Sequence, residues 1–585
     1  GNAFIEVTPI EGLVFKSSLS GKLSYWGNEG FTPEYYLSAT SVNTQNRLSR
    51  SRAKGFGWNL ENTVSYKKTI NLHDFSVLLG QGVYVDDITS EVGLTYYDLP
   101  VNNRDGASFN FQVTDDQKVG YSWTGTEHKV TSLFSRLSYN YDGKYLFTGI
   151  VRRDGSSRFG QNNKFGVFPS FSAGWNVTNE DFFPETDIIN RLKIRGGYGV
   201  TGNDAIGNFG YLALIGGGRN YTFGADGGTI YLGYSPNAPD NPDLKWEETS
   251  QVNIGFEARI FNDINVTFDY YTKTTTGILQ PVEIPGYVGA SGFPIGNVAD
   301  MDNTGLELEL GFKKELGEFN FSASGNVSYL KNEVTFLGNG KEFIGGGAGF
   351  QSMGSVTRIQ VGESINSFYG YQTNGVFQNT NEVNSYVNSA GAVIQPNAVP
   401  GDFKWVDLDD NGEINEDDRS FLGTPLPKYT FGLTLSLKYK NFDFMTFTQG
   451  VAGNKIFQGL RRLDVANANY QTSILNRWTG EGSTNSYPRL TNSDPNGNYG
   501  KFSDHYLEKG DFIRFKTVQL GYSLPSDLIS KIGAQKMRLY VTGENLFTLT
   551  NYTGFDPEIG GNVLGIDKGF YPQARSFMFG VNLQF

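Results

Sequence analysis

The chain of 585 residues contains no cysteine and only three histidines, which removes most metal-based and thiol-based chemistry from consideration. Without cysteine there is no disulfide and no thiolate nucleophile, a composition that suits an oxidising compartment such as the periplasm or cell surface without excluding the cytosol. His73, His128 and His505 lie far apart in the sequence; none belongs to an H-E-x-x-H pair, and no G-x-S-x-G nucleophile elbow is present. We therefore predict that the chain is not an enzyme.

The sequence also lacks an excess of positive charge and long apolar runs. Its 48 Lys and Arg residues are outnumbered by 60 Asp and Glu residues, which gives a formal net charge of −12. Because no basic stripe is available to neutralise phosphates, we expect no nucleic-acid partner. No run of about 18 apolar residues occurs, so no transmembrane helix is predicted. The chain is therefore either soluble or inserted in a membrane as a β-barrel.

The residues that are abundant are those of β-structure. Aromatic residues make up 15% of the chain, and 74 Gly accompany only 20 Pro. Several segments alternate apolar and polar residues with the period of two that a strand requires; in one of them Val252, Ile254 and Phe256 share a face. This pattern recurs at 252–260, 264–270, 306–312 and 431–439.

The lengths of the connections separate a membrane barrel from a soluble sandwich or propeller, which alternate in the same way. Outer-membrane barrels have short periplasmic turns and long extracellular loops, whereas a soluble sandwich has no reason to segregate its loops by length. Tight connections are predicted at 141–143, 261–263, 314–318 and 440–441, and long ones at 201–248, 275–302, 335–427 and 458–509. The segregation favours an antiparallel transmembrane β-barrel of the all-β class.

The C-terminal segment FMFGVNLQF alternates and stops on an aromatic residue. It resembles the terminal signal by which the barrel-insertion machinery recognises outer-membrane proteins, and its apolar positions are Phe577, Phe579, Val581, Leu583 and Phe585. Counting back from this strand gives about 17 strands, an odd number, whereas bacterial single-chain barrels use even numbers. We therefore expect that Gly1 is not the natural start of the protein. The other strands are expected near 1–8, 12–25, 55–67, 72–86, 129–140, 143–153, 164–177, 190–200, 249–261, 262–274, 303–313, 319–332, 428–439, 441–456, 510–524 and 536–548.

Several long motifs occur in an order that resembles one known family. Together they resemble the barrel of SusC-like TonB-dependent transporters, from end to end of the chain. A single one of these motifs would not be specific, but the ordered set is. The motifs are DGSSRFG (154–160), FGVFPSFSAGW (165–175), LKIRGGYGVTGN (192–203), NPDLKWEET (241–249), GDFIRFKTVQLGYSLP (510–525), VTGENLFTLTNYTGFDPEIGG (541–561) and YPQARSFMFGVNLQF (571–585).

The resemblance implies a barrel of roughly 22 strands whose lumen is filled by an N-terminal plug. Residues 1–585 would then be a partial barrel that lacks the plug and the first strands. The implied activity is import of a large solute, a glycan or a peptide, across a bacterial outer membrane. TonB would energise it through the missing plug, a SusD-like surface lipoprotein would cap it, and outer-membrane lipid would surround it. A passive porin-type channel and a surface adhesin remain as alternatives.

Aromatic residues in the predicted long loops are candidate ligand contacts. Flat aromatic faces stack on sugar rings or receive apolar peptide side chains, although packing within the loops or against a lid would also explain them. The candidates are Tyr221, Phe223, Tyr231, Tyr234, Phe350, Tyr470 and Tyr487.

The stretch WVDLDDNGEINEDDR, 405–419, carries acidic residues in the register of an EF-hand loop. Gly412 occupies the sixth position, Ile414 is placed to anchor the loop inward, and the last ligand is Asp418 rather than the usual Glu, as in dockerin-type loops. We predict a structural Ca²⁺ in this extracellular segment, 401–420, rather than a merely solvated acidic loop. The expected ligands are Asp407, Asp409, Asn411, the Glu413 carbonyl, Asn415 and Asp418.

Overall fold

The structure is a computed structural model that consists mainly of antiparallel strands and forms two compact units. Unit 1 comprises Gly1–Trp175, Gly197–Ser250 and Thr276–Val298, and unit 2 comprises Asn176–Gly196, Gln251–Thr275 and Ala299–Phe585. The residues described are 1–39, 41–184, 186–223, 228–338, 340–463, 468–530, 533–559 and 563–585.

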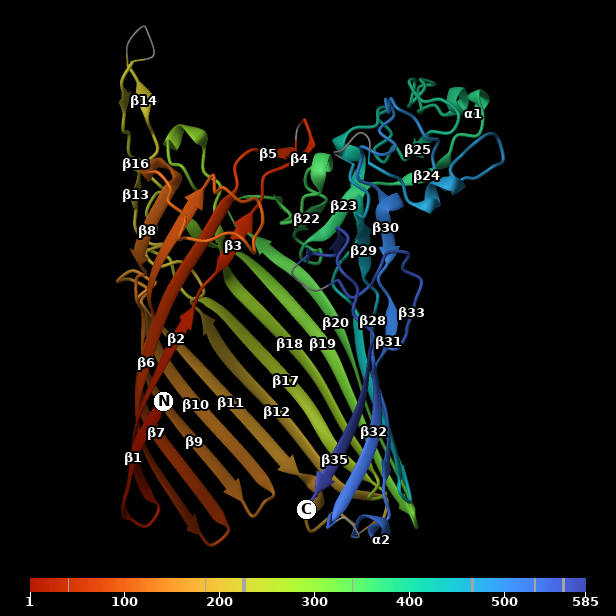
Figure 1. Ribbon diagram of the computed structural model, residues 1–585. Helices are drawn as coiled ribbons and strands as arrows, with labels where there is room; N and C mark the ends of the chain where they lie inside the picture. Colours follow the sequence, from red (N-terminus) through yellow and green to blue (C-terminus); the bar gives the residue numbers. More distant parts are fainter. Residues whose placement is uncertain are drawn as a thin grey trace. The chain divides into compact units, whose positions relative to one another are not determined.

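Unit 1 is built on a meander in which each long strand pairs with the next one along the chain (Figure 1). The antiparallel order is β1–β2–β6–β7–β9–β10–β11, while β3 prolongs the pairing with β6 and β8 pairs with the far part of β7. The strands are β1 (Asn2–Ile10), β2 (Leu13–Trp26), β3 (Glu29–Thr32), β4 (Tyr35–Ser38), β5 (Ser41–Asn43), β6 (Arg47–Ile70), β7 (His73–Tyr97), β8 (Lys118–Thr124), β9 (His128–Tyr141), β10 (Tyr145–Ser156), β11 (Phe165–Asn176), β13 (Ile215–Gly216), β14 (Tyr221–Thr222), β15 (Ile230–Tyr231) and β16 (Ser235–Pro236).

Unit 2 repeats the meander in the order β19–β20–β27–β28–β31–β32–β35, with β33 prolonging the pairing of β31. Five strands have residues in both units: β11, whose last residue Asn176 belongs to unit 2, and β12 (Ile189–Asn203), β17 (Glu247–Ile260), β18 (Ile264–Pro281) and β19 (Ile295–Leu316). The remaining long strands are β20 (Phe319–Leu337), β27 (Tyr429–Tyr439), β28 (Phe442–Ala452), β31 (Phe512–Ser523), β32 (Lys536–Glu544), β33 (Thr548–Thr550) and β35 (Ser576–Gln584).

The long connections of unit 2 contain a small folded region of their own, with a four-stranded sheet, a two-stranded sheet and a three-stranded sheet. Its strands are β21 (Phe343–Gly345), β22 (Thr357–Gln360), β23 (Ser367–Tyr371), β24 (Thr373–Val376), β25 (Phe403–Trp405), β26 (Arg419–Gly423), β29 (Lys455–Gln458), β30 (Leu507–Lys509) and β34 (Ile566–Asp567).

Among the described residues of both units, the helices are α1 (Thr380–Ser385) and α2 (Ser526–Ile529), with short 3-10 turns η1 (Asp115–Gln117), η2 (Val177–Asn179), η3 (Gly286–Val288), η4 (Gln351–Met353), η5 (Glu416–Asp418), η6 (Thr472–Asn476) and η7 (Asp504–Tyr506). Among the described residues, no helix is long and apolar enough to cross a membrane.

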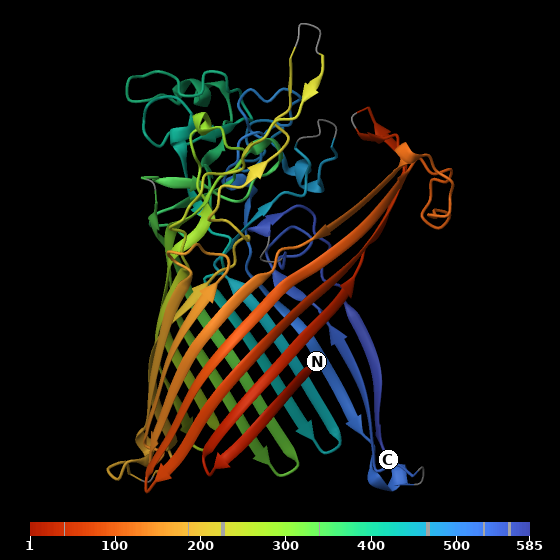
Figure 2. The same cartoon turned by 90° about the vertical axis from the view of Figure 1, so that its left-hand side faces the viewer.

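Short and long connections alternate within each unit, as the sequence predicts (Figure 2). In unit 1, β9 and β10 are joined by a tight turn in which Asp142 has a φ of 51°. In unit 2, Lys440 takes a φ of 52° in the two-residue turn between β27 and β28, whereas 338–428 separate β20 from β27. The positive φ values reverse the chain within two or three residues, which keeps neighbouring strands in hydrogen-bonding register.

Large apolar side chains are exposed at every second position of many long strands. On β7, Phe75, Val77 and Leu79 are 40%, 41% and 57% exposed. On the last strand the five apolar positions of FMFGVNLQF are all exposed, from Leu583 at 43% to Phe579 at 83%. An ordered apolar face of this extent is far larger than a soluble monomer presents to water, so it is suited to contact with lipid.

Each of the 17 strands expected from the sequence has a counterpart in the structure, but several run further than predicted. The strands expected at 55–67 and 72–86 are β6 and β7, which pair as far as Arg47 and Tyr97 with one bulge between Phe56 and Trp58. The connection expected at 275–302 is shorter in the structure, where it spans 282–294, because β18 and β19 both extend into the expected range. These extensions are held by backbone hydrogen bonds. The extensions of β6, β18 and β19 carry no regular apolar alternation, whereas that of β7 alternates again at Ile88, Val92, Leu94 and Tyr96 in a phase shifted by the bulge.

The exposed face of β35 generates a test of the expected insertion signal. Replacing Phe585 with Ser should lower the amount of heat-modifiable protein in the outer membrane, because the terminal aromatic residue would no longer be presented to the insertion machinery. The matched control is Asn582→Ser, a change on the opposite face of β35, which should leave the amount unchanged. Equal assembly of both variants would contradict the signal and leave β35 as a strand only.

Candidate functional site

The segment 407–418 folds into a compact loop that gathers carboxylates. One oxygen from each of Asp407, Asp409 and Asp418 lies within 4.8 Å of the others. Asp418 is fully buried; its Oδ1 accepts from the backbone N–H of Leu408 at 2.7 Å and its Oδ2 from that of Asn415 at 2.8 Å. The bond from Leu408 closes the loop by joining its first and last parts, and the bond from Asn415 caps the short turn η5 at the end of the loop.

Side-chain oxygens inside the loop fix its turns. Asp407 Oδ2 accepts from the Gly412 N–H at 2.9 Å, and Asp409 Oδ1 accepts from the Asn411 N–H at 3.1 Å. Asn411 Oδ1 in turn accepts from the Glu413 N–H at 2.8 Å. Gly412 has a φ of 86°, so the sharp turn at the sixth position needs the residue that lacks a Cβ.

Both apolar and polar contacts anchor the loop to the rest of unit 2. Ile414 packs against the buried cluster of Tyr371, Val376, Phe403 and Trp405, which confirms the inward orientation predicted for it. Glu416 accepts from Arg419 at 2.7 Å, and this hydrogen bond holds the pKa of its carboxyl below the usual value. Burial, with the nearby Glu416 charge, raises the pKa of Tyr371 to about 12.

The oxygen atoms that the loop offers as ligands fit a hard cation, which prefers oxygen. Asp407 Oδ1 is buried and has no hydrogen-bond partner, which is costly for a carboxylate oxygen unless another group meets it. Three clustered carboxylates also repel one another, and a divalent cation relieves that repulsion. The structure therefore brings together Asp407, Asp409 and Asp418 of the predicted ligands, with Asn411, Glu413 and Asn415 in the same loop.

A second candidate site is a cavity of about 230 Å³ in the long connections of unit 2. Three of the aromatic residues proposed from the sequence, Phe350, Tyr470 and Tyr487, contribute to its lining. Phe350 is only 1% exposed and belongs mainly to the apolar cluster beneath the cavity. Sequence reasoning missed the other lining residues, because they follow no motif: Gln458, Gly459, Arg461, Leu463, Gln471, Ser473, Tyr499, His505, Tyr506, Glu508 and Thr553.

The other four aromatic candidates belong to unit 1. Tyr221 pairs with Tyr231 across the two-stranded sheet of β14 and β15, and Phe223 lies edge-on to both at ring distances of 5.0 and 5.4 Å. Tyr234 is 68% exposed. These side chains make an exposed aromatic hairpin and do not line the unit 2 cavity.

Among the described residues that line the cavity, the acidic and basic side chains are those of Arg461, His505 and Glu508. Burial lowers the pKa of His505 to about 4, so its imidazole is neutral and offers one donor and one acceptor. Burial also raises the pKa of Tyr499 and of Tyr506, so both keep their hydroxyl protons. Glu508 accepts three hydrogen bonds, from Gln458 Nε2 and from the backbone and hydroxyl of Thr553.

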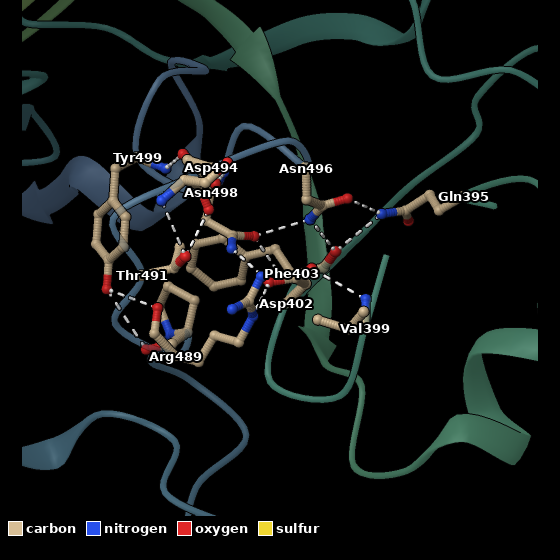
Figure 3. Close-up of polar contacts among 12 residues, drawn as sticks. Gln395, Val399, Asp402, Phe403, Arg489, Thr491, Asp494, Asn496, Asn498 and Tyr499 are labelled. Carbon is tan, nitrogen blue, oxygen red and sulfur yellow. Dashed lines mark hydrogen bonds and ion pairs between the residues drawn. The ribbon is translucent and has the colours of Figure 1, made fainter. Parts of the chain in front are cut away.

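A buried polar network holds the two longest connections of unit 2 together (Figure 3). Asp402 is fully buried, and its Oδ1 accepts from Arg489 Nε at 2.6 Å and from Asn498 Nδ2 at 2.8 Å. Asn498 Oδ1 accepts from the Phe403 N–H at 2.9 Å, and Asn496 donates to the Phe403 carbonyl at 3.0 Å. The segment around Asp402 is thereby fixed to 489–498, next to the cavity wall at Tyr499.

Residues 10–546 match a family model described as "TonB dependent receptor-like, beta-barrel". TonB-dependent receptor P3 of Formosa agariphila is 31% identical over 98% of this chain and 57% of its own length. TonB-dependent receptor SusC of Bacteroides thetaiotaomicron is 28% identical over 99% of this chain and also 57% of its own length. The chain therefore spans little more than half of these relatives.

Among solved structures, the RagAB peptide importer in the "open-open" state matches with a TM-score of 0.82 and 25% identity, covering 100% of this chain and 60% of that chain. The same importer in the "closed-closed" state matches with a TM-score of 0.80.

The network around Asp402 generates a prediction of local stability. Asp402→Asn keeps the volume but removes the charge opposite Arg489, and breaking a buried pair costs about 3–5 kcal/mol. We expect amide hydrogen exchange in 395–405 and 489–499 to accelerate by about 100-fold or more, since each 1.4 kcal/mol is a factor of ten. The control is Glu315→Gln, which removes an exposed pair with Lys313 and should change exchange little. Unchanged exchange in Asp402→Asn would contradict the role of the network.

Proposed function

Because this chain belongs to the TonB-dependent receptor β-barrel family, we propose that it forms the wall and outer loops of a transporter that imports a large solute. The family confirms two expectations drawn from the sequence: the fold is an all-β antiparallel barrel, and the protein is located in the outer membrane. The family also confirms a third expectation, that the protein is not an enzyme, because its members are transporters.

The observation that carries this proposal is the match of 10–546 to the barrel of the family. Two features of the structure support it independently of the match. Alternate side chains of the long strands form an exposed apolar face, and the long connections of unit 2 fold into an ordered region with a cavity. A transporter needs both, a surface that lipid covers and a place where solute is retained.

Two further parts of the machinery belong to the proposal. The relatives extend well beyond the length that this chain spans, which supports a plug and a TonB-contacting segment in the whole protein. RagAB is described as a peptide importer with "open-open" and "closed-closed" states, which supports a partner that opens and closes like a SusD-like lid. The solute is proposed to be a glycan or a peptide, too large for a passive pore.

We further propose that the loop 407–418 holds a structural Ca²⁺. Asp407, Asp409, Asn411, the Glu413 carbonyl, Asn415 and Asp418 would be its ligands, and the unpartnered Oδ1 of Asp407 supports this assignment. Magnesium fits less well because it retains several waters. The ion would stiffen the loop on the cluster around Trp405 and would take no part in chemistry.

The import proposal predicts a dependence on energy. In cells that produce the full-length protein, inactivating TonB should reduce uptake of labelled glycan and peptide mixtures to the level of cells without the protein. A passive channel would retain uptake without TonB. An adhesin would hold the label at the cell surface whether TonB works or not. Either result would contradict active import.

The calcium proposal predicts a titratable site of modest affinity. Extracellular calcium modules bind with dissociation constants of roughly 10⁻⁴ to 10⁻³ M, so calorimetry of the purified protein should show a heat of binding in this range. The double variant Asp407→Ala, Asp409→Ala should abolish it. Asp417→Ala, which removes an exposed carboxylate outside the predicted ligand set, is the matched control and should bind as the wild type does. Equal heats for wild type and double variant would restore the solvated-loop interpretation.

A further inference from the structure

Arg461 stands out among the residues that line the unit 2 cavity. Its guanidinium lies over the ring of Tyr470, 4.0 Å from the centroid, and the side chain is half-buried. Among the described residues, which leave out 464–467, no carboxylate pairs with it, and its Nε is buried without a hydrogen-bond partner. Arg461 therefore brings to the cavity wall a positive charge that no described carboxylate neutralises.

The nearby carboxylate of Glu508 does not pair with the Arg461 guanidinium. Glu508 also lines the cavity, but its oxygens are engaged by Gln458 and Thr553, at 3.0 Å and at 2.6 and 2.7 Å. Burying a donor without a partner is costly, and the contact with Tyr470 offsets only part of that cost. A planar guanidinium that keeps its charge in such a place is suited to a planar anion, above all a carboxylate that accepts two parallel hydrogen bonds.

The shape and walls of the cavity indicate what bears the carboxylate. At about 230 Å³ the cavity is smaller than the pockets that enclose drug-sized molecules, roughly 300–1,000 Å³, so it accommodates one unit of a larger ligand. Tyr487 and Tyr499 supply aromatic faces, and the neutral His505 with the amide of Gln471 supplies donors and acceptors that suit ring hydroxyls.

One of the two strands that line the cavity is closed to an added peptide strand. Gln458 lies at the end of β29, which is hydrogen-bonded to β30 on one side and to β34 on the other. Addition of a strand to an open sheet edge is one way in which an extended peptide binds, and β29 itself offers no such edge, whereas β30, which carries Glu508, pairs with β29 alone.

We propose that this cavity binds one acidic sugar unit of a glycan, with the uronate carboxylate on Arg461 and the ring against the tyrosine walls. The proposal rests on the proposed import function in one respect: the ligand is taken to be part of the imported solute. It narrows the substrate from a glycan or a peptide to a glycan that carries carboxylates.

Calorimetry on the full-length protein in detergent tests this directly. The probes are trimers of galacturonate and of mannuronate, the neutral trimer galactotriose, and the acidic peptide triglutamate. At least one uronate trimer should bind, and Arg461→Gln should weaken it by about tenfold or more, because hydrogen bonds to charged groups contribute about 1.5–3 kcal/mol. Galactotriose should bind the wild type at least about tenfold more weakly for the same reason.

The matched control is Arg462→Gln. Arg462 follows Arg461 in the chain, is exposed and does not line the cavity, so its loss changes the net charge by the same amount without touching the site. Its affinity for the uronate trimer should stay within about twofold of the wild type, because exposed charges contribute little.

Four results would overturn the proposal: no binding of either uronate trimer, equal affinity of Arg461→Gln and wild type, equal affinity for galactotriose, or tighter binding of triglutamate. The last would assign the cavity to an acidic peptide instead. Binding in detergent needs neither TonB nor a membrane, so failure of this inference and failure of the import proposal are visible in separate experiments.

Discussion

The constraint on which the rest of this structure depends is that a backbone in lipid must satisfy its own hydrogen bonds. Strands achieve this only by pairing with neighbours, so the chain forms meanders in which each long strand joins the next, as Arg47 to Ile70 do with His73 to Tyr97. Side chains then point alternately to the two faces of the sheet. The outward face carries residues such as Phe75, Val77 and Leu79, and chemistry is confined to the other face and to the connections.

The long connections are under no such constraint, and they are ordered by a different interaction. Asp402 is buried within hydrogen-bond distance of Arg489 and Asn498, which belong to another connection 87 and 96 residues away. A buried carboxylate is tolerated only when its oxygens are met, so the two connections are held in one arrangement. The cavity wall at Tyr499 follows directly from this junction, because Asp494 accepts from the backbone N–H of both Asn498 and Tyr499 at 2.8 Å.

This division explains which features the sequence predicts. Lipid imposes a period of two on membrane-spanning strands, so β17, β27 and β35 are evident from Val252, Phe431 and Phe577 onward. The acidic loop is evident because Asp407 and Gly412 occupy fixed positions in a short local motif. Arg461, His505 and Glu508 show no such signal, since their proximity arises from packing between connections that are distant in sequence. For the same reason, only Phe350, Tyr470 and Tyr487 of the seven aromatic candidates line the cavity.

The acidic loop and the cavity share one support, so they are not energetically independent. Glu416 accepts from the hydroxyl of Tyr371 at 3.3 Å, and the backbone N–H of Tyr371 donates to the Phe502 carbonyl at 2.9 Å. Two residues further along, Thr373 donates twice to Asp504, the neighbour of His505 in the cavity wall. A Ca²⁺ ion bound to the loop as proposed would therefore also restrict the segment that carries His505. Because an ordered wall loses less conformational entropy when a ligand binds, cation and ligand should favour each other's binding, and by linkage to the same extent.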